Sequence, residues 1–247
     1  MPKIIENKIL DYIKKHKIVK SREIEKYFNL TQSSARRYLI KLEEQGYINR
    51  TFGEIILKDN HSFQDQDFEK KINSNLNVKK SIAKYASKLS LGYKTVFVDS
   101  GSLCYFLLQY LDKKVELFTN SLSNAKRAID LGFENVNILG GVIKPETKSI
   151  VEFNEEELNK IVFPISFLGV NAIDDEGNLY TPEKREAKAK NNIIKKTLIT
   201  IVLAEEEKFS FKSTFKFNDD DSKIIIVSNI KNKKIENENV QIINTKD

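Results

Sequence analysis

Three short blocks of apolar residues at helical spacing open the chain, and a segment that alternates apolar and polar residues follows them. The blocks predict helices over residues 4–15, 21–28 and 31–46. Ser21 and Thr31 are the predicted N-caps of the second and third helices, since their hydroxyls can accept hydrogen bonds from helix N–H groups. The alternation over residues 47–58 predicts a two-stranded hairpin.

In the third predicted helix, the residues expected to face the core are Ala35, Tyr38, Leu39 and Leu42. Two helices joined by a tight turn and followed by a hairpin form the layout of a winged helix-turn-helix, which we assign to residues 1–58. The opposite face of the third helix exposes polar residues, namely Gln32, Ser33, Ser34, Arg36 and Arg37. Early helix positions reach base edges in the major groove, while Arg36, Arg37 and Arg50 can neutralise phosphates. The pattern therefore predicts binding to double-stranded DNA.

Residues 59–76 are polar with little periodicity, and we expect a linker there. From residue 77 to 247, apolar strands alternate with amphipathic helices. The expected strands read, in chain order, "TVFVD", "VELFTN", "VNILGG", "ISFLGVNAI", "LITIVLA", "KIIIVSN" and "VQII". Continuous apolar strands separated by helices predict a parallel sheet covered on both faces, which is a Rossmann-like α/β domain.

Positive charge is concentrated in the first quarter of the chain. Of the net charge of +6, residues 1–60 contribute most, with 13 Lys and Arg against 8 Asp and Glu; the rest of the chain has 28 against 27. A basic segment joined to a near-neutral body is typical of a polyanion-binding module. The sequence has no apolar run of about 18 residues and no signal-peptide pattern, so we expect a cytoplasmic location and no membrane partner.

Histidine and cysteine are scarce, and this limits the chemistry available to the chain. His16 and His61 are the only histidines, so residues 62–247 cannot use imidazole as an acid, a base or a metal ligand. The single cysteine, Cys104, excludes an internal disulfide and a thiolate-rich zinc site. We expect no metal, no cofactor and no catalytic residue.

Small and polar residues follow three of the predicted strands, at the edge where parallel sheets bind ligands. They are Asp99, Ser100, Gly101 and Ser102 after the first strand, Thr119, Asn120 and Ser121 after the second, and Gly140 and Gly141 after the third. Backbone N–H groups and hydroxyls in such turns can bind an anion. Each turn alone is also consistent with a simple tight turn, and only their convergence at one edge predicts a site. Dinucleotide and P-loop fingerprints are both missing from the sequence.

Charged residues near other predicted strand ends extend this candidate site. Lys208 follows a strand and is placed to contact a phosphate, and Glu186 and Lys190 lie one turn apart on one helix face. The alternative for the helical residues is an exposed ion pair of little energetic weight.

These motifs resemble the DeoR family of bacterial transcriptional repressors over nearly the whole chain. The segment "TQSSARRYLIKLEEQGYINR" is similar to the family's helix-turn-helix pattern, with Ala35 and Tyr38 as departures. The segments "DSGSL", "TNS", "GG", "FLGVNAID", "TPEKREAKAK" and "EEEKF" resemble, in order, six signatures of the family's effector domain. Leu103 and Cys104 depart from that pattern, because they stand in place of threonines.

The resemblance implies an effector domain with the fold of ribose-5-phosphate isomerase that senses a phosphorylated sugar. It implies a repressor of a sugar-metabolism operon that works as a homodimer or homotetramer. Two alternatives stay open from the residues. One is a sugar-phosphate isomerase or deaminase using Asp99, Glu186 and Lys208, which the lack of histidine disfavours; the other is a protein-interaction module.

Overall fold

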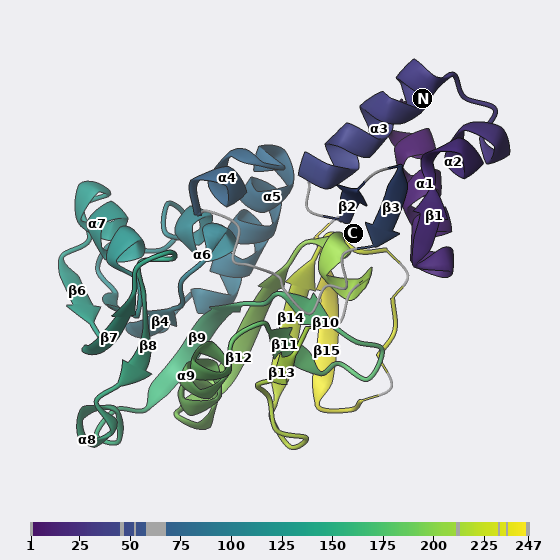
Figure 1. The fold of residues 1–247 in the computed structure, drawn as a ribbon. Coiled ribbons are helices and arrows are strands. Elements are labelled where there is room, and N and C mark those ends of the chain that lie inside the picture. The colour runs from purple at the N-terminus through teal and green to yellow at the C-terminus, as the bar shows by residue number, and fades with distance from the viewer. Residues whose placement is uncertain are drawn as a thin grey trace. The chain divides into compact units, whose positions relative to one another are not determined.

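The computed structural model describes residues 2–44, 47–51, 53–57, 68–210, 213–231, 233–235 and 237–245. The chain divides into two compact units, residues 1–62 and 63–247 (Figure 1). Among the described residues, no helix has the length and the apolar character needed to cross a membrane.

The first unit combines three helices with a small antiparallel sheet. Its elements are α1 (Pro2–His16), β1 (Ile18–Lys20), α2 (Ser21–Tyr27), α3 (Gln32–Glu44), β2 (Ile48–Thr51) and β3 (Glu54–Leu57). The strand order is β1-β3-β2, so the predicted hairpin of β2 and β3 gains a third strand. A strand of three residues is too short to show alternation, and for this reason β1 was not predicted. The helix-turn-helix followed by a hairpin is confirmed.

Packing in this unit follows the predicted helix faces. The four residues of α3 expected to face the core, Ala35, Tyr38, Leu39 and Leu42, are all buried. The predicted cap at Thr31 is confirmed, since its Oγ1 accepts a hydrogen bond from the N–H of Ser34 at 3.3 Å. The predicted cap at Ser21 is wrong, because α2 already includes Ser21 and the capping position is Lys20. The predicted helix end at Gly46 lies outside the described residues.

The second unit contains a sheet of seven parallel strands. In spatial order these are β15 (Val240–Asn244), β14 (Ile224–Ser228), β12 (Thr197–Ala204), β9 (Phe163–Gly169), β4 (Thr95–Val98), β5 (Glu116–Thr119) and β6 (Asn135–Ile138). Every neighbouring pair is parallel, so the predicted α/β architecture is confirmed. The chain adds strands outward from β4 in one direction and from β9 in the other. The β4/β9 boundary is therefore the switch point of the sheet, where ligands bind in such folds.

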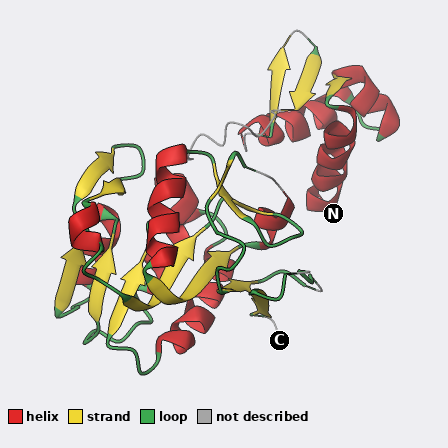
Figure 2. Cartoon of the chain, turned by 90° about the horizontal axis from the view of Figure 1, so that it is seen from below, coloured by secondary structure: helices red, strands yellow, loops and turns green. Residues whose placement is uncertain are grey.

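Helices cover both faces of this sheet (Figure 2). Four of the helices with residues in the two cores are α5 (Leu76–Ser87), α6 (Ser102–Leu107), α7 (Leu122–Asp130) and α9 (Lys184–Lys195). The first three pack with Val96, Val98 and Phe167 on one face, and α9 packs with Phe97 and Leu168 on the other. Adjacent residues of one strand thus enter different cores, which explains the unbroken apolar runs in the sequence.

Shorter elements surround the main sheet, and the sequence pattern did not predict most of their strands. They are η2 (Lys88–Ser90), β7 (Gly141–Lys144), β8 (Ser149–Phe153), α8 (Glu155–Leu158), β10 (Ala172–Ile173), β11 (Leu179–Thr181), η3 (Glu206–Ser210) and β13 (Phe215–Lys216). Strands β7 and β8 form an antiparallel hairpin, and β10, β11 and β13 form a small antiparallel sheet. The single strand expected for "ISFLGVNAI" is divided into β9 and β10.

Part of the predicted linker, residues 59–76, is helical. Residues 58–67 lie outside the described residues, and α4 (Phe68–Asn73) follows them directly. Phe68 packs edge-to-face on Tyr105 of α6, with ring centroids 5.7 Å apart. Helix α4 is thus fastened to the sheet unit by an aromatic contact that its polar sequence does not reveal.

Candidate functional site

Helix α3 presents one apolar face to its core and one polar face to solvent. Gln32, Ser33, Arg36 and Arg37 are exposed, and Ser34 is partly exposed. The hydroxyls of Ser33 and Ser34 lie 3.1 and 3.0 Å from Thr31 Oγ1, so the start of the helix carries a small hydroxyl cluster. The predicted base-reading positions therefore lie on the accessible face.

Arg50 in β2 has a partner that sequence reasoning did not identify. Its Nε donates to Glu43 Oε2 at 2.8 Å, and its backbone N–H donates to Glu43 Oε1 at 3.1 Å. The pair joins the hairpin to α3 and leaves the Arg50 side chain 30% exposed. Arg50 thus fixes the hairpin relative to the helix, and its exposed part is available for a phosphate contact.

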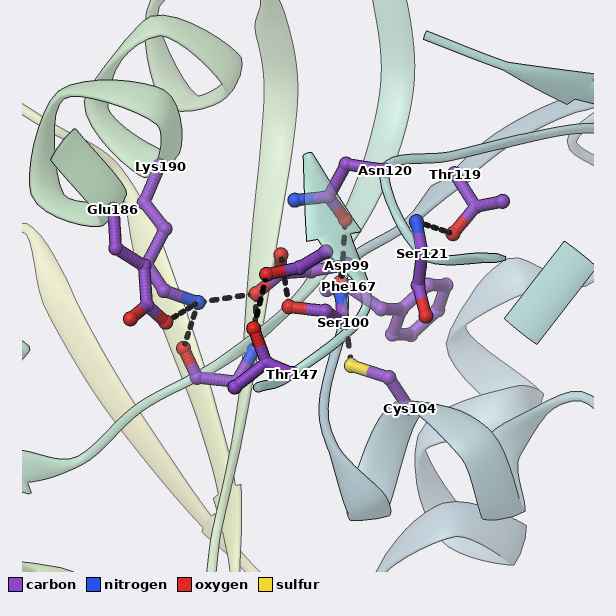
Figure 3. A network of polar contacts seen from close by, with 12 residues as sticks. Asp99, Ser100, Cys104, Thr119, Asn120, Ser121, Thr147, Phe167, Glu186 and Lys190 are labelled. Carbon is purple, nitrogen blue, oxygen red and sulfur yellow. Dashed lines mark hydrogen bonds and ion pairs between the residues drawn. The ribbon is translucent and has the colours of Figure 1, made fainter. Parts of the chain in front are cut away.

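At the carboxyl edge of the sheet, two of the three predicted turns meet (Figure 3). Asn120 follows β5, and its Oδ1 accepts the backbone N–H of Ser100, which follows β4, at 2.9 Å. Ser100, Gly101 and Ser102 are partly exposed. Gly101 has φ +117°, a backbone conformation that side chains rarely adopt, so this sharp turn favours glycine. The structure therefore brings residues 99–102 and 119–121 together as predicted, with the first turn accessible to solvent.

Asp99 and Lys190 form a buried ion pair at the same edge. Lys190 Nζ donates to Asp99 Oδ2 and, at 3.0 Å, to the carbonyl of Gly169, the last residue of β9. Asp99 Oδ2 also accepts the N–H of Gly169 at 3.1 Å. The side chains of Lys190 and Asp99 are only 4% and 2% exposed. The pair therefore ties the ends of β4 and β9 to α9 from inside the protein.

Charge on Lys190 is stabilised by its neighbours. Burial alone would lower the pKa of Lys190, but the nearby carboxylates of Asp99 and Glu186 outweigh burial and raise it. Glu186 Oε1 lies 3.7 Å from Lys190 Nζ and is partly exposed. The predicted grouping of Glu186 with Lys190 is thus observed, with Glu186 nearer the surface.

The remaining residues of the second turn organise the start of α7. Ser121 Oγ caps that helix by accepting the N–H of Asn124 at 3.2 Å, and Thr119 Oγ1 accepts the N–H of Ser121 at 3.2 Å. Asn124 was not predicted as a site residue. It is fully buried, and its Nδ2 donates to the carbonyl of Asp99 at 2.8 Å. No motif in the sequence marks Asn124, and only the packing of α7 beside the first turn brings it to Asp99.

Gly140 and Gly141 lead into the β7–β8 hairpin. A Cβ on Gly141 would lie 1.6 Å from the carbonyl oxygen of Glu152 in the facing strand, so only glycine allows this pairing. Both glycines are exposed. The hairpin packs on the end of β5, where the N–H of Ile150 donates to the carbonyl of Asn120 at 2.7 Å. The observed role of Gly141 is therefore in the hairpin backbone.

Lys208 lies on η3, directly after β12. Its side chain is 21% exposed, and its Nζ lies 3.2 Å from Glu207 Oε1. Strand β12 pairs with β9, whose last residue Gly169 contacts Asp99 and Lys190. Lys208 therefore belongs to the same edge of the sheet, one strand away from the buried pair.

Leu103 and Cys104 of α6 lie in the hydrophobic core between the helices and one face of the sheet, and not in the polar turn. Cys104 is fully buried, and its Sγ donates to the carbonyl of Phe167 at 3.6 Å. Burial, assisted by the negative charge of Asp99, raises the pKa of the Cys104 thiol. The two departures from the threonine pattern therefore change core packing rather than the exposed edge.

Both units match models of known domain families. Residues 6–60 match the DeoR-like helix-turn-helix domain, and residues 74–229 match the DeoR C terminal sensor domain.

Curated relatives extend over most of the chain. The sequence is 30% identical over 206 residues to the uncharacterized HTH-type transcriptional regulator FruR of Bacillus subtilis, covering 81% of this chain and 80% of that protein. It is 30% identical over 207 residues to the HTH-type transcriptional regulator IolR of the same organism, covering 83% and 81%. It is 23% identical over 208 residues to the glycerol-3-phosphate regulon repressor of Escherichia coli, covering 82% and 81%.

Among solved structures, the chain is similar to ribose 5-phosphate isomerase A from Methanocaldococcus jannaschii. The TM-score is 0.42 at 16% sequence identity, and the match covers 55% of each chain.

Proposed function

Because the chain belongs to the DeoR family of transcriptional regulators, we propose that it represses a sugar-metabolism operon under the control of a phosphorylated sugar. The observation that carries the proposal is the joining of a DeoR-like helix-turn-helix, with exposed arginines on α3, to a DeoR sensor domain in one chain. Both domains match regulators, so the isomerase or deaminase alternative is set aside.

DNA binding is assigned to residues 1–58, with α3 in the major groove. Gln32, Ser33 and Ser34 stand at the start of the helix, where side chains reach base edges. Arg36, Arg37 and Arg50 contact phosphates and release counterions, which makes the affinity fall as salt rises. The Arg50–Glu43 pair supports this role, because it holds the hairpin at a constant distance from the helix.

The effector site is assigned to the carboxyl edge of the sheet in residues 77–247. The residues there that are partly exposed are Ser100, Gly101 and Ser102 of the turn, together with Glu186 and Lys208. One carboxylate oxygen of Glu186, Oε2, is buried. Lys208 supplies the positive charge for a phosphate, while hydroxyl and backbone groups of the turn donate to it. Five buried residues support this edge through the contacts described above, namely Asp99, Thr119, Asn120, Ser121 and Lys190. Gly140 and Gly141 lead into the hairpin beside it.

A sugar attached to that phosphate would be selected by the hydrogen-bonding groups around the turn. The name of one relative, the glycerol-3-phosphate regulon repressor, refers to a small phosphorylated polyol. A ligand of this class has one strong anionic group and several hydroxyls. The edge matches both, with one partly exposed cation and a turn rich in serine.

Regulation requires that the effector prefer one arrangement of the protein to another. A ligand that bound both arrangements equally would leave DNA affinity unchanged. Coupling of about 1 to 3 kcal/mol is typical of such switches and corresponds to a change in DNA affinity of about 5- to 150-fold. We expect a cytoplasmic homodimer or homotetramer, because two recognition helices must meet half-sites about 34 Å apart.

The test uses the full-length protein, DNA from upstream of its own operon, and three phosphorylated probes. Ribose 5-phosphate, glucosamine 6-phosphate and glycerol 3-phosphate are screened by thermal shift, with the unphosphorylated compounds as controls. A probe that raises the melting temperature is then added to the protein–DNA complex, and release is followed by fluorescence anisotropy. Failure to bind any upstream DNA would contradict the proposal and favour a protein-interaction module. Turnover of a probe would restore the enzyme hypothesis.

A further inference from the structure

A second buried ion pair lies outside the effector turn, between α5 and the segment that follows β12. Lys79 Nζ lies 3.0 Å from Glu205 Oε2 and donates to Glu205 Oε1 at 3.2 Å. The two side chains are 1% and 8% exposed, although they are 126 positions apart in the sequence. The carboxylate of Glu205, three positions before Lys208, therefore has a buried cationic partner in α5.

The ammonium of Lys79 also contacts the turn between α4 and α5. It donates to the carbonyl of Ser74 at 2.6 Å and to Ser74 Oγ at 3.2 Å. Ser74 directly follows the last residue of α4, and Asn75 between the helices has φ +50°. One buried cation therefore links the C-terminal end of α4 to the carboxylate of Glu205.

On the other side, Glu205 is joined to the proposed phosphate ligand. The backbone N–H of Lys208 donates to the carbonyl of Glu205 at 2.9 Å, which closes one tight turn of η3. Two residues before Glu205, Leu203 is the register partner of Gly169, which contacts the Asp99–Lys190 pair. If Lys208 moves when it binds an anion, the turn of residues 205–208 moves with it. The Glu205 carboxylate in that turn is paired with Lys79.

Helix α4 is held at its other end as well. Phe68 packs on Tyr105 of α6, and α6 begins at Ser102 in the proposed effector turn. Both ends of α4 are therefore attached to elements that start at the carboxyl edge of the sheet. Helix α4 also precedes α5 and the sheet in the second unit, residues 63–247.

We propose that Lys79 and Glu205 are positioning residues that couple the Lys208 turn to the α4–α5 turn, and that effector binding reaches the DNA-binding unit through this link. The inference rests on the proposed function for its ligand, but the link itself is a property of the unliganded protein. Packing alone would let either turn loosen independently. A shared buried charge pair makes the two turns order together, because separating them leaves two unpaired charges without water.

The test compares the full-length protein with the double variant K79M/E205M. Removing one partner leaves an unpaired buried charge and endangers folding, whereas replacing both with Met keeps the volume and removes both charges. The control is K216Q/D220N, which removes the ion pair between Lys216 of β13 and Asp220. The two charged atoms of this pair are 2.6 Å apart, and both side chains are more exposed than those of Lys79 and Glu205. Each double variant loses one positive and one negative charge, so the wild type and both variants have the same net charge.

The first measurement is hydrogen exchange without ligand. We expect K79M/E205M to exchange about tenfold faster in both residues 68–79 and residues 205–210, with the control unchanged. Faster exchange in only one of the two segments, or in neither, would overturn the proposed link. This result does not depend on any effector.

The second measurement is the ratio of DNA dissociation constants with and without the most stabilising of the three phosphorylated probes. For the wild type we expect a ratio of about 5 to 150, and for K79M/E205M a ratio near 1 with unchanged DNA affinity in the absence of probe. A ratio equal to that of the wild type would overturn the coupling role. If the wild type itself responds to none of the probes, the proposed function fails, and the exchange result still decides whether Lys79 and Glu205 link the two turns.

Discussion

Lys190 on α9 holds Asp99 at the end of β4 in a buried ion pair, across 91 positions of sequence. The same ammonium binds the carbonyl of Gly169, and the same carboxylate binds its N–H. Helix α9 is thereby fixed to the switch point of the sheet, where β4 and β9 lie side by side. The edge that we assign to effector binding is thus built on an internal electrostatic contact.

Lys190→Met is expected to destabilise the protein by about 3 to 5 kcal/mol, because it leaves the Asp99 carboxylate buried without its partner. Urea unfolding followed by circular dichroism measures the loss. The double variant D99N/K190M should lose clearly less, since it leaves no buried charge. A loss below about 1 kcal/mol for Lys190→Met would show that the pair contributes little to the fold.

Replacing both Arg36 and Arg37 with Ala is expected to weaken DNA binding and to flatten its salt dependence. Each lost phosphate contact lowers the slope of log affinity against log salt by about 1. Fluorescence anisotropy across a salt series measures both effects. The control is K114A/K160A, which removes two exposed positive charges from the other unit. Unchanged binding by R36A/R37A would contradict the assignment of α3 as the recognition helix.

Lys208→Ala is expected to abolish the release of DNA by the effector while leaving DNA affinity itself unchanged. The Lys208 side chain lies on η3 and is 21% exposed, so we expect its removal to leave the fold intact. Anisotropy of labelled DNA, with and without the phosphorylated probe, measures the two quantities. Release at the wild-type concentration of probe would exclude Lys208 as a phosphate ligand.

Gly141→Ala is expected to cost at least about 2 kcal/mol of stability, because the new Cβ would overlap the carbonyl of Glu152 in the facing strand. Thermal and urea unfolding measure the change. Gly140→Ala is the matched control, since the nearest atom to its Cβ would be Glu157 Oε2 at 3.9 Å. Equal stability of the two variants would mean that β7 and β8 separate at little cost.

Cys104 is expected to stay protonated and unreactive in the native protein, because burial raises the pKa of its thiol. The unfolded thiol ionises at its usual pKa and the native thiol does not, so stability is complete below about pH 8.5 and falls above it. The contribution to this fall is at most about 1.4 kcal/mol per pH unit. Unfolding between pH 7 and 10, compared with Cys104→Ala, isolates it. Rapid labelling of the native thiol at pH 8 would contradict the prediction.

Local patterns in the sequence were sufficient for most of the fold. The inward face of α3 follows from helical spacing alone, and all four predicted residues are buried. The central strands β9, β12 and β14 are apolar runs, which stand out because both of their faces are covered. Strand β1 was missed because it has only three residues, and the β7–β8 hairpin was missed because its strands show no alternation of buried and exposed positions.

The position of the candidate site could be predicted from the sequence, but the roles of its residues could not. Polar residues at strand ends can be found from the strands themselves, and the contact of Ser100 with Asn120 confirms that two of the turns meet. The roles of the individual residues do not follow from motifs. Lys190 and Asp99 were expected at the ligand and are found almost wholly buried, while Asn124 carries no motif and still binds the turn.

The amino-acid sequence by itself determined the order of the domains, the α/β class, the helix-turn-helix with its exposed arginines and the family to which the chain belongs. These properties depend on spacing and residue type over short segments, which a sequence displays directly. Only the tertiary structure decided which charges meet. Lys79 finds Glu205, and Lys190 finds Asp99, because packing of helices on the sheet brings distant residues into a dry interior. In that environment an unpaired charge raises the free energy of the folded protein, so each buried charge lies beside a charge of opposite sign.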